Sequence, residues 1–300
     1  MTGGTPAVGD GAVAPPPGDG SYPAAPGAAP PGTASPAAVP WVTRRPPMIE
    51  RRAGSVLAPV AAAVLLLAAW EIAAQFVSPV LISSPQQVAA AFVDEFRSGT
   101  STSALAISLR ELYLGMGIGL AAGIALGVVI GRYRVLGSIF SPFVNAANAT
   151  PLNVLIPLLI VWVGISSEAR VLFVVLITFF PVLLNTAGGL RNVSRGYVEV
   201  GQTLGMTERQ LLRKVILPGA VPYIFAGVRI GVALAVIGMI VGEMEVSNVG
   251  LGYLLNFFGT GFQTDKLLAL VFLAALIGVV NVLIVRGIQA RWFSWITAAR

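Results

Sequence analysis

The chain has 300 residues, of which 56% are hydrophobic and only 11% are charged, and its formal net charge is +6. Soluble domains carry about 25% charged residues, so this composition excludes an ordinary soluble domain and indicates several membrane spans. There is no Cys and no His, which excludes disulfides, thiolate chemistry and imidazole ligands or bases. We therefore expect no catalytic residue, no metal site and no enzyme, and we interpret the positive charge as a signal of membrane topology rather than of nucleic-acid binding.

The N-terminal region differs from the rest of the chain. It is rich in Pro, Gly and Ala and has almost no large apolar side chain, so it cannot bury enough surface to offset the entropy of ordering. We predict a disordered cytoplasmic tail over residues 1–50 and a transmembrane domain over residues 51–300. The first apolar run starts only near Val56, behind a group of arginines, which favours a retained first span over a cleaved signal peptide.

Apolar segments along the chain predict the fold class. A helix needs about 20 apolar residues to cross the hydrocarbon core. We therefore predict an all-α fold, a polytopic membrane bundle of about six transmembrane helices with a cytoplasmic loop. The third segment contains Pro142, Pro151 and Pro157, and the fourth is short, so these two have the least defined bounds. The segments are 56–76, 104–130, 139–163, 170–187, 222–242 and 267–286.

A short stretch before the second segment has the pattern of a helix start. Ser84 stands at the cap position, Pro85 follows it, and Gln87 is placed to bond back to the cap. Phe92 and Phe96 then fall on one face. We predict an amphipathic helix over residues 83–98 that lies in the membrane interface, with contact to an extracytoplasmic binding protein as the alternative.

The second apolar segment has a glycine at every fourth position. Small residues at this spacing let two helix backbones approach closely in lipid. Two interpretations stay open: packing against a neighbouring span of the same chain, or contact with a second subunit. The helix-packing residues are Gly115, Gly119, Gly123, Gly127 and Gly131.

The third segment is polar where its prolines interrupt it. Prolines inside a span are tolerated where neighbouring helices or water satisfy the freed carbonyls, so this segment suits the lining of a path. Amide groups there can bind an oxyanion without a fixed charge, and hydrogen bonding between helices is the alternative. The candidate path residues are Asn145, Asn148, Thr150, Pro151 and Asn153.

Charged residues at membrane depth cost about 2.5–3.5 kcal/mol each on insertion scales and are functional candidates by default. Glu243 and Glu245 stand at the end of the fifth segment. We expect both to face water or a neighbouring loop, with a role in gating as the alternative.

The Lys and Arg residues predict the orientation. If the N-terminus is cytoplasmic, most of the 19 Lys and Arg residues lie on that side of the membrane. The positive-inside rule then places both termini in the cytoplasm. The loop over residues 188–221 lies on the same side.

This loop is more organised than a simple connection. Residues 199–204 have the pattern of a short helix that Gly205 stops. Thr207 is followed by Gln210 three residues later, which is the spacing of a capping box. The loop therefore predicts two short helices, the second of which starts at Thr207.

The second of these helices combines apolar and basic residues. Leu211 and Leu212 lie along one face, and we expect Leu217-Pro218 and Pro222 to end the helix. A helix that shows both kinds of side chain to water is a suitable ligand for a groove on a cytoplasmic partner. The alternative is a surface helix that lies against the membrane face of its own protein.

The loop also keeps the spacing of a known motif. In order, it has Glu199-Val200-Gly201, three residues, Gly205, nine residues, Val215, one residue and Leu217-Pro218. This resembles the "EAA" loop of binding-protein-dependent ABC importer permeases, whose pattern is Glu-Ala-Ala, three, Gly, nine, Ile, one, Leu-Pro. Val200, Gly201 and Val215 depart from that pattern, and Gly201 should loosen the first short helix by about 1 kcal/mol relative to Ala.

The resemblance extends over about residues 78–295. The stretches that carry it look like the branch of the family that imports sulfonates, taurine, nitrate and similar small compounds. They are SSPQQV at 83–88, SLRELYLGMGIGLAAGIALGVVIG at 108–131, PLNVLIPLLIVWVGI at 151–165, GEMEVSNVGLGYLL at 242–255 and Arg291-Trp292.

The resemblance implies a permease subunit of the bacterial inner membrane, with two copies, expected as a homodimer, forming the path. An extracytoplasmic binding protein would deliver the compound, and a cytoplasmic ABC ATPase dimer would contact the loop. The coupling residues that it implies are Glu199, Gly201, Gly205, Thr207, Leu211, Leu212, Leu217 and Pro218.

The sequence has no nucleotide site of its own. The P-loop motif G-x-x-x-x-G-K-[ST] is absent, because neither Lys214 nor Lys266 has the required glycines. We therefore expect this chain to bind no cofactor and the partner ATPase to use ATP. An ATPase-independent secondary transporter or channel is the alternative, although the inverted repeats and intramembrane charge chains of such carriers are not found.

Overall fold

The computed structural model describes residues 50–292, and within them the chain is helical, with no strand. This confirms the all-α prediction for that part of the chain. The tail predicted over residues 1–50 lies outside the described residues, apart from Glu50. The chain divides into two units, Met1–Pro59 and Val60–Arg300, and the packing described below is that of the second unit.

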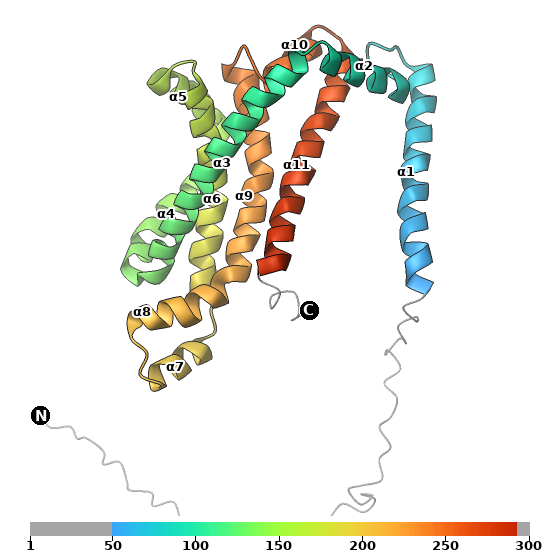
Figure 1. Cartoon of the computed structure of the whole chain (residues 1–300). Coiled ribbons are helices and arrows are strands. Elements are labelled where there is room, and N and C mark those ends of the chain that lie inside the picture. The colour runs from blue at the N-terminus through green and yellow to red at the C-terminus, as the bar shows by residue number, and fades with distance from the viewer. Residues whose placement is uncertain (1–49, 293–300) are drawn as a thin grey trace, which may run out of the picture. The chain divides into compact units, whose positions relative to one another are not determined.

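Within residues 50–292, five helical segments are long and apolar enough to cross a membrane, and a sixth is obtained if one bent pair counts as a span. This agrees with the prediction of about six spans. Figure 1 shows how the helices of the second unit are arranged in space. The spanning segments are Ala58–Phe76 within α1 (Glu50–Phe76), α3 (Thr100–Arg132), α6 (Ser167–Arg191), the continuous run Glu208–Val246 and α11 (Thr264–Trp292).

The fourth span is longer than the sequence indicates. We predicted a short segment over residues 170–187, but α6 has 25 residues. It starts earlier because Ser166 caps it, the side chain accepting a hydrogen bond from Ala169 N–H at 3.3 Å. Pro181 lies inside α6 without ending it. A capped polar first turn adds length to a span that hydropathy alone does not detect.

The third span is the bent pair. It consists of α4 (Arg134–Ala149), the short 3-10 helix η1 (Leu152–Leu155) and α5 (Ile156–Val163), with a bend of 91°. Pro151 is at the break, and it restricts the preceding Thr150 to an extended backbone. Pro142 lies inside α4, and Pro157 is in the first turn of α5, where its missing N–H leaves no hydrogen bond unmade. Of the three prolines, only Pro151 interrupts the span.

The glycine stripe of α3 lies against α6. A Cβ atom added to any of its five glycines would lie 3.0 Å or less from an atom of α6, such as Val182 beside Gly123 or Thr186 beside Gly127. Glycines of α9 (Leu217–Val246) pack on α6 in the same way, for example Gly231 against Val182, which also meets Gly123 of α3. The stripe therefore packs within the chain, with helix backbones in close contact.

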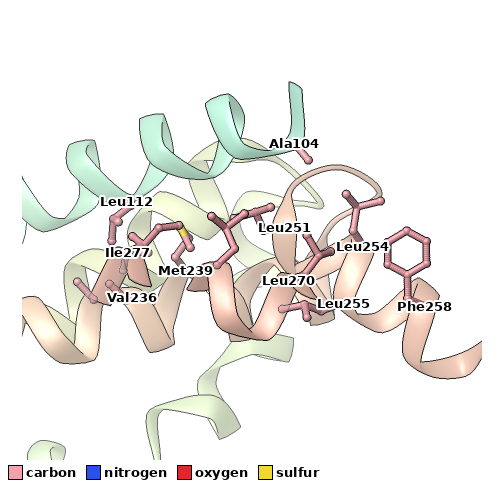
Figure 2. Close-up of a cluster of buried hydrophobic side chains, with 13 residues drawn as sticks. Ala104, Leu112, Val236, Met239, Leu251, Leu254, Leu255, Phe258, Leu270 and Ile277 are labelled. Carbon is pink, nitrogen blue, oxygen red and sulfur yellow. The ribbon is translucent and has the colours of Figure 1, made fainter. Parts of the chain in front are cut away.

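The main hydrophobic core lies where α3, α9, α10 (Leu251–Thr260) and α11 meet (Figure 2). Leu112, Met239, Leu251 and Leu270 are almost completely buried there. Full burial of such a side chain contributes about 1.5–3 kcal/mol. This packing fixes α10 at the end of the bundle opposite to α7 (Arg195–Thr203) and α8 (Glu208–Leu211), as Figure 1 shows.

The predicted amphipathic helix is α2 (Pro85–Arg97), and its capping box between Ser84 and Gln87 is confirmed. Phe92 and Phe96 pack against the main core. Glu95 of the same helix is buried, accepts a hydrogen bond from Ser101 Oγ at 3.2 Å and pairs with Lys266 Nζ at 3.0 Å. These contacts connect α2 to α3 and α11, because a buried carboxylate needs partners.

Candidate functional site: a polar hairpin at one end of the bundle

The loop between α6 and α9 folds as a helical hairpin, α7–Gly205–α8. Gly205 has a φ of +72°, a left-handed conformation that glycine adopts without a steric penalty. Met206 N–H donates to Gly201 O at 3.1 Å, which closes the end of α7. Gly205 therefore stops the first short helix, as the sequence predicts, and turns the chain back toward the bundle.

The start of α8 is held by the predicted capping box. Thr207 Oγ1 accepts from Gln210 N–H at 3.4 Å, and Gln210 Oε1 accepts from Thr207 N–H at 2.8 Å. The box satisfies two backbone donors that would otherwise lack partners. Together with Gly205, it fixes the angle between α7 and α8.

The second helix does not end at Leu217-Pro218, so that prediction is wrong. From α8 the chain continues through the π-helical segment η2 (Leu212–Ile216) into α9, and Glu208–Val246 forms one run of 39 residues. Pro218 lies in the first turn of α9. Proline lacks the N–H that an uninterrupted helix requires, and the wider π turn just before it accommodates this change of hydrogen bonding. The consequence is that α8 and the membrane-spanning α9 are continuous.

Leu211 lies inside the hairpin. We had expected from the sequence that it would be displayed to a partner, and it is not. Its side chain is only 5% exposed. A Cβ atom on the buried Gly201 would lie 2.7 Å from Leu211 Cδ1. Leu212 and Leu217 are partly buried. The absence of a side chain at Gly201 therefore makes room for Leu211, which forms the small core between α7 and the second helix.

The apolar surface of the hairpin lies on α7 instead. Tyr197, Val200 and Leu204 are 70%, 59% and 70% exposed. Their spacing of three and four residues puts them on one face of the helix, and Glu199 is exposed elsewhere on the same helix. Exposed apolar patches of this kind mark interaction sites. Sequence reasoning missed this face, although three apolar residues at helical spacing in a polar loop were a signal for it.

The hairpin is attached to the bundle at several points. Glu208 of α8 forms an ion pair with Arg132 at the end of α3. The linker before α7 packs on the start of α9, where a Cβ atom added to Gly219 would lie 3.1 Å from Val193 Cγ1. The hairpin is therefore held against α3 through Glu208, it is continuous with α9, and the linker that leads into it contacts α9 as well.

The candidate path residues lie around the bend of the third span, and all five are exposed. Thr150 Oγ1 donates to Ala146 O at 3.0 Å. Asn145 also lines a hollow between α4 and the end of α6. Asn148, Pro151 and Asn153 are on the surface, and the described part of one chain does not enclose a path around them.

A buried polar network lies at the opposite end of the bundle, and sequence reasoning missed it. Arg170 Nε and Nη2 donate to Glu111 Oε2 and Oε1 at 2.8 and 2.6 Å, and Ser167 Oγ donates to Glu111 Oε1 at 2.7 Å. Both charged side chains are buried. Glu111 could have been found as a charge inside a span, but its partner is 59 residues away in the sequence.

Glu243 belongs to the same region and is fully buried, so it does not face water. It faces the neighbouring loop, as the other half of the expectation said, because a Cβ atom on Gly250 would lie 2.5 Å from Glu243 Cδ. Its Oε2 accepts from Gly252 N–H at 2.7 Å, and Ser108 Oγ accepts from Leu251 N–H at 2.8 Å. The first N–H groups of a helix lack intrahelical partners, and these two side chains supply them for α10. Glu245 is exposed, as we expected.

Comparison with known proteins identifies the family. A model of the family "binding-protein-dependent transport system inner membrane component" matches residues 119–294, which include the whole hairpin. The chain belongs to this family. It is thus a multi-pass membrane permease subunit of the ABC importer type, and not the ATPase-independent carrier that the sequence left open as an alternative. The family implies ATPase and binding-protein partners.

The relatives agree with this assignment. The formylaminopyrimidine transport permease protein ThiX of Halalkalibacterium halodurans is 32% identical over 82% of this chain and 98% of its own length. The taurine transport system permease protein TauC of Escherichia coli is 30% identical over 78% of this chain and 87% of its own length. A solved structure of an amino acid ABC transporter has a TM-score of 0.52 at 19% identity, covering 67% of this chain and 96% of that chain, which is a likeness of fold.

Proposed function

We propose that the chain forms half of the translocation path of an ABC importer for a sulfonate, taurine, nitrate or a similar small compound. The resemblance of its sequence to that branch supports the substrate class, and TauC is named as a taurine permease. An extracytoplasmic binding protein delivers the compound. The chain itself binds no cofactor, and a separate ATPase hydrolyses ATP.

The hairpin is the docking element for that ATPase. The observation that carries this proposal is the continuity of α8 with α9 over Glu208–Val246, because a movement imposed on α8 is then passed directly to a spanning helix. The exposed face of Tyr197, Val200 and Leu204 supplies apolar contact area. With both termini in the cytoplasm, the hairpin lies on the side where ATP is available.

Close glycine packing supports movement of α9. The contacts of α6 with the glycines of α3 and α9 join nearly smooth helix surfaces, which can slide without disrupting interlocked side chains. The ATPase dimer moves the hairpin, α9 follows, and access to the path alternates between the two sides of the membrane.

A second copy completes the path. The amides around the bend of the third span are exposed in one chain, and polar groups at membrane depth are expensive unless they face water or protein. In the homodimer, Asn145, Asn148 and Asn153 of the two copies line the space between them. These residues are the first to substitute when the path is mapped.

The test is co-purification of the ATPase encoded with this permease. Glu199→Arg reverses a charge at an exposed position of α7, and Gly205→Pro prevents the left-handed conformation on which the hairpin depends. We expect both variants to reach the membrane and to lose the ATPase. Glu245→Arg, an equally exposed change at the other end of the bundle, is the control and should keep it. Recovery of the ATPase at wild-type yield with both hairpin variants would refute the docking proposal.

A further inference from the structure

A large hollow lies between the hairpin and the bundle and has no role in the proposed docking. It has a volume of about 980 Å³ and is bounded by the end of α3, by α4, by the end of α6 and by α7. No Asp or Glu is among the described residues that line it. Its polar lining consists of Arg132, Ser138, Ser141, Asn145, Arg191 and Arg195.

Two of the three arginines leave the hollow with uncompensated positive charge. Arg132 is paired with Glu208, but no ion pair involves Arg191 or Arg195 in the described part of the chain. Like charges that surround one space repel each other, and the repulsion is relieved when an anion enters. A planar guanidinium group can also donate two parallel hydrogen bonds to two oxygens of a phosphate or sulfonate group.

Arg191 is held in place at the edge of the hollow. Its Nη2 donates to Ile130 O at 3.1 Å, and its Nη1 lies 3.5 Å from Ser141 Oγ. To reach these atoms, the guanidinium crosses the first turn of α4 at Gly137, where a Cβ atom would collide with Nη2. Gly137 therefore provides the space that the arginine needs.

The face of α4 that lines the hollow adds neutral hydrogen-bond donors. Ser138, Ser141 and Asn145 follow one another at spacings of three and four residues, so they project from one side of the helix. Hydroxyl and amide groups donate to an anion without adding charge. Guanidinium, hydroxyl and amide donors thus converge on one space.

We propose that this hollow binds an oxyanion, a phosphate or sulfonate group, at the cytoplasmic end of the permease. The cytoplasmic placement rests on the proposed function. The same chemistry has two possible sources, which are a small anion from the cytoplasm, including an imported sulfonate, and the headgroup of an anionic phospholipid of the inner leaflet. Because α3, α4, α6 and α7 all contribute, a bound anion stiffens the connection between the hairpin and the bundle.

The binding test uses the purified full-length chain in nanodiscs. In phosphatidylcholine nanodiscs, inorganic phosphate and methanesulfonate are titrated, and the unfolding temperature reports binding. In nanodiscs that also contain phosphatidylglycerol, native mass spectrometry reports retained lipid. Arg195→Gln removes charged donors and Gly137→Ala displaces the Arg191 guanidinium. Each should weaken binding about 10- to 150-fold, since a hydrogen bond to a charged group contributes about 1.5–3 kcal/mol. Arg195 is exposed and forms no ion pair with any residue that the structure describes, so its replacement should leave folding intact.

The control is Arg291→Gln. It removes the same charge from an exposed residue in the last turn of α11, which does not line the hollow. A response to the small anions alone identifies a free oxyanion, and retained lipid alone identifies a headgroup. Binding of neither probe, or an equal loss with Arg291→Gln, overturns the inference. Failure of the ATPase to co-purify with the wild-type chain contradicts the proposed function instead, so the two failures are distinguishable.

Discussion

At the α10 end of the bundle Glu111, Arg170 and Glu243 are buried and hydrogen-bonded, whereas at the α7–α8 end most charged side chains are exposed. Glu111 and Arg170 bond to each other, and Glu243 caps α10 from inside the bundle. The hairpin instead buries Leu211 and displays Tyr197 and Leu204. The difference indicates that one end is built to hold its helices in place and the other to present a surface.

The largest expected effect comes from the buried ion pair. Arg170→Met leaves Glu111 buried without its cation, and breaking a buried pair in this way costs about 3–5 kcal/mol. We expect a large fall in unfolding temperature. The double variant Glu111→Leu/Arg170→Met removes both charges and should recover much of that loss. If the single variant is as stable as the wild-type protein, the ion pair does not stabilise the α10 end of the bundle.

Next in size is the close packing of α3 on α6. Gly123→Ala forces a Cβ atom to within 2.9 Å of Phe179 O and Val182 Cβ, and overpacking of this kind costs about 1–3 kcal/mol. We expect lower stability and lower uptake of the substrate.

The matched control for this substitution is on the same helix. Gly117→Ala meets no atom within 4 Å, so it changes only helix propensity, which favours Ala by about 1 kcal/mol. Equal behaviour of the two variants would show that the glycine stripe is not a packing surface.

The smallest expected loss of stability comes from removing one of the two capping boxes. Thr207→Ala and Ser84→Ala each remove one cap, at a cost of about 1 kcal/mol. Only the first cap is in the hairpin, so only Thr207→Ala should weaken ATPase association, measured as the ATPase yield at equal permease yield. A similar loss of ATPase with Ser84→Ala would mean that general stability, and not the hairpin, controls association.

Features that depend on neighbouring residues could be predicted from the sequence. Both capping boxes and the stop at Gly205 are local, because each needs only a few adjacent residues, and the apolar runs located the spans. Glu111 and Arg170 meet across 59 residues, and α10 folds back to meet Glu243. Such contacts depend on how helices pack, so the sequence pattern did not reveal them.

In the hairpin, too, the sequence did not reveal contacts that depend on how helices pack, although the residues involved are close in the chain. Leu211 and Leu212 were correctly placed on a helix, but the face that is buried depends on the angle set at Gly205. The missing side chain at Gly201 then decides that Leu211 packs inward. The continuity through η2 was missed because Leu217-Pro218 normally indicates a helix end, and a π turn that accommodates a proline has no simple sequence signature.

The central claim is that the hairpin is a cytoplasmic surface occupied by an ATPase. Since the chain has no Cys, single Leu204→Cys and Glu245→Cys variants can be labelled with a membrane-impermeant maleimide in intact cells and in inverted vesicles, with and without the ATPase. The account predicts that the cysteine at position 204 is labelled only in inverted vesicles and is protected by the ATPase, and that the cysteine at position 245 is labelled only in intact cells. Labelling of position 204 from outside the cell, or no protection by the ATPase, would contradict it.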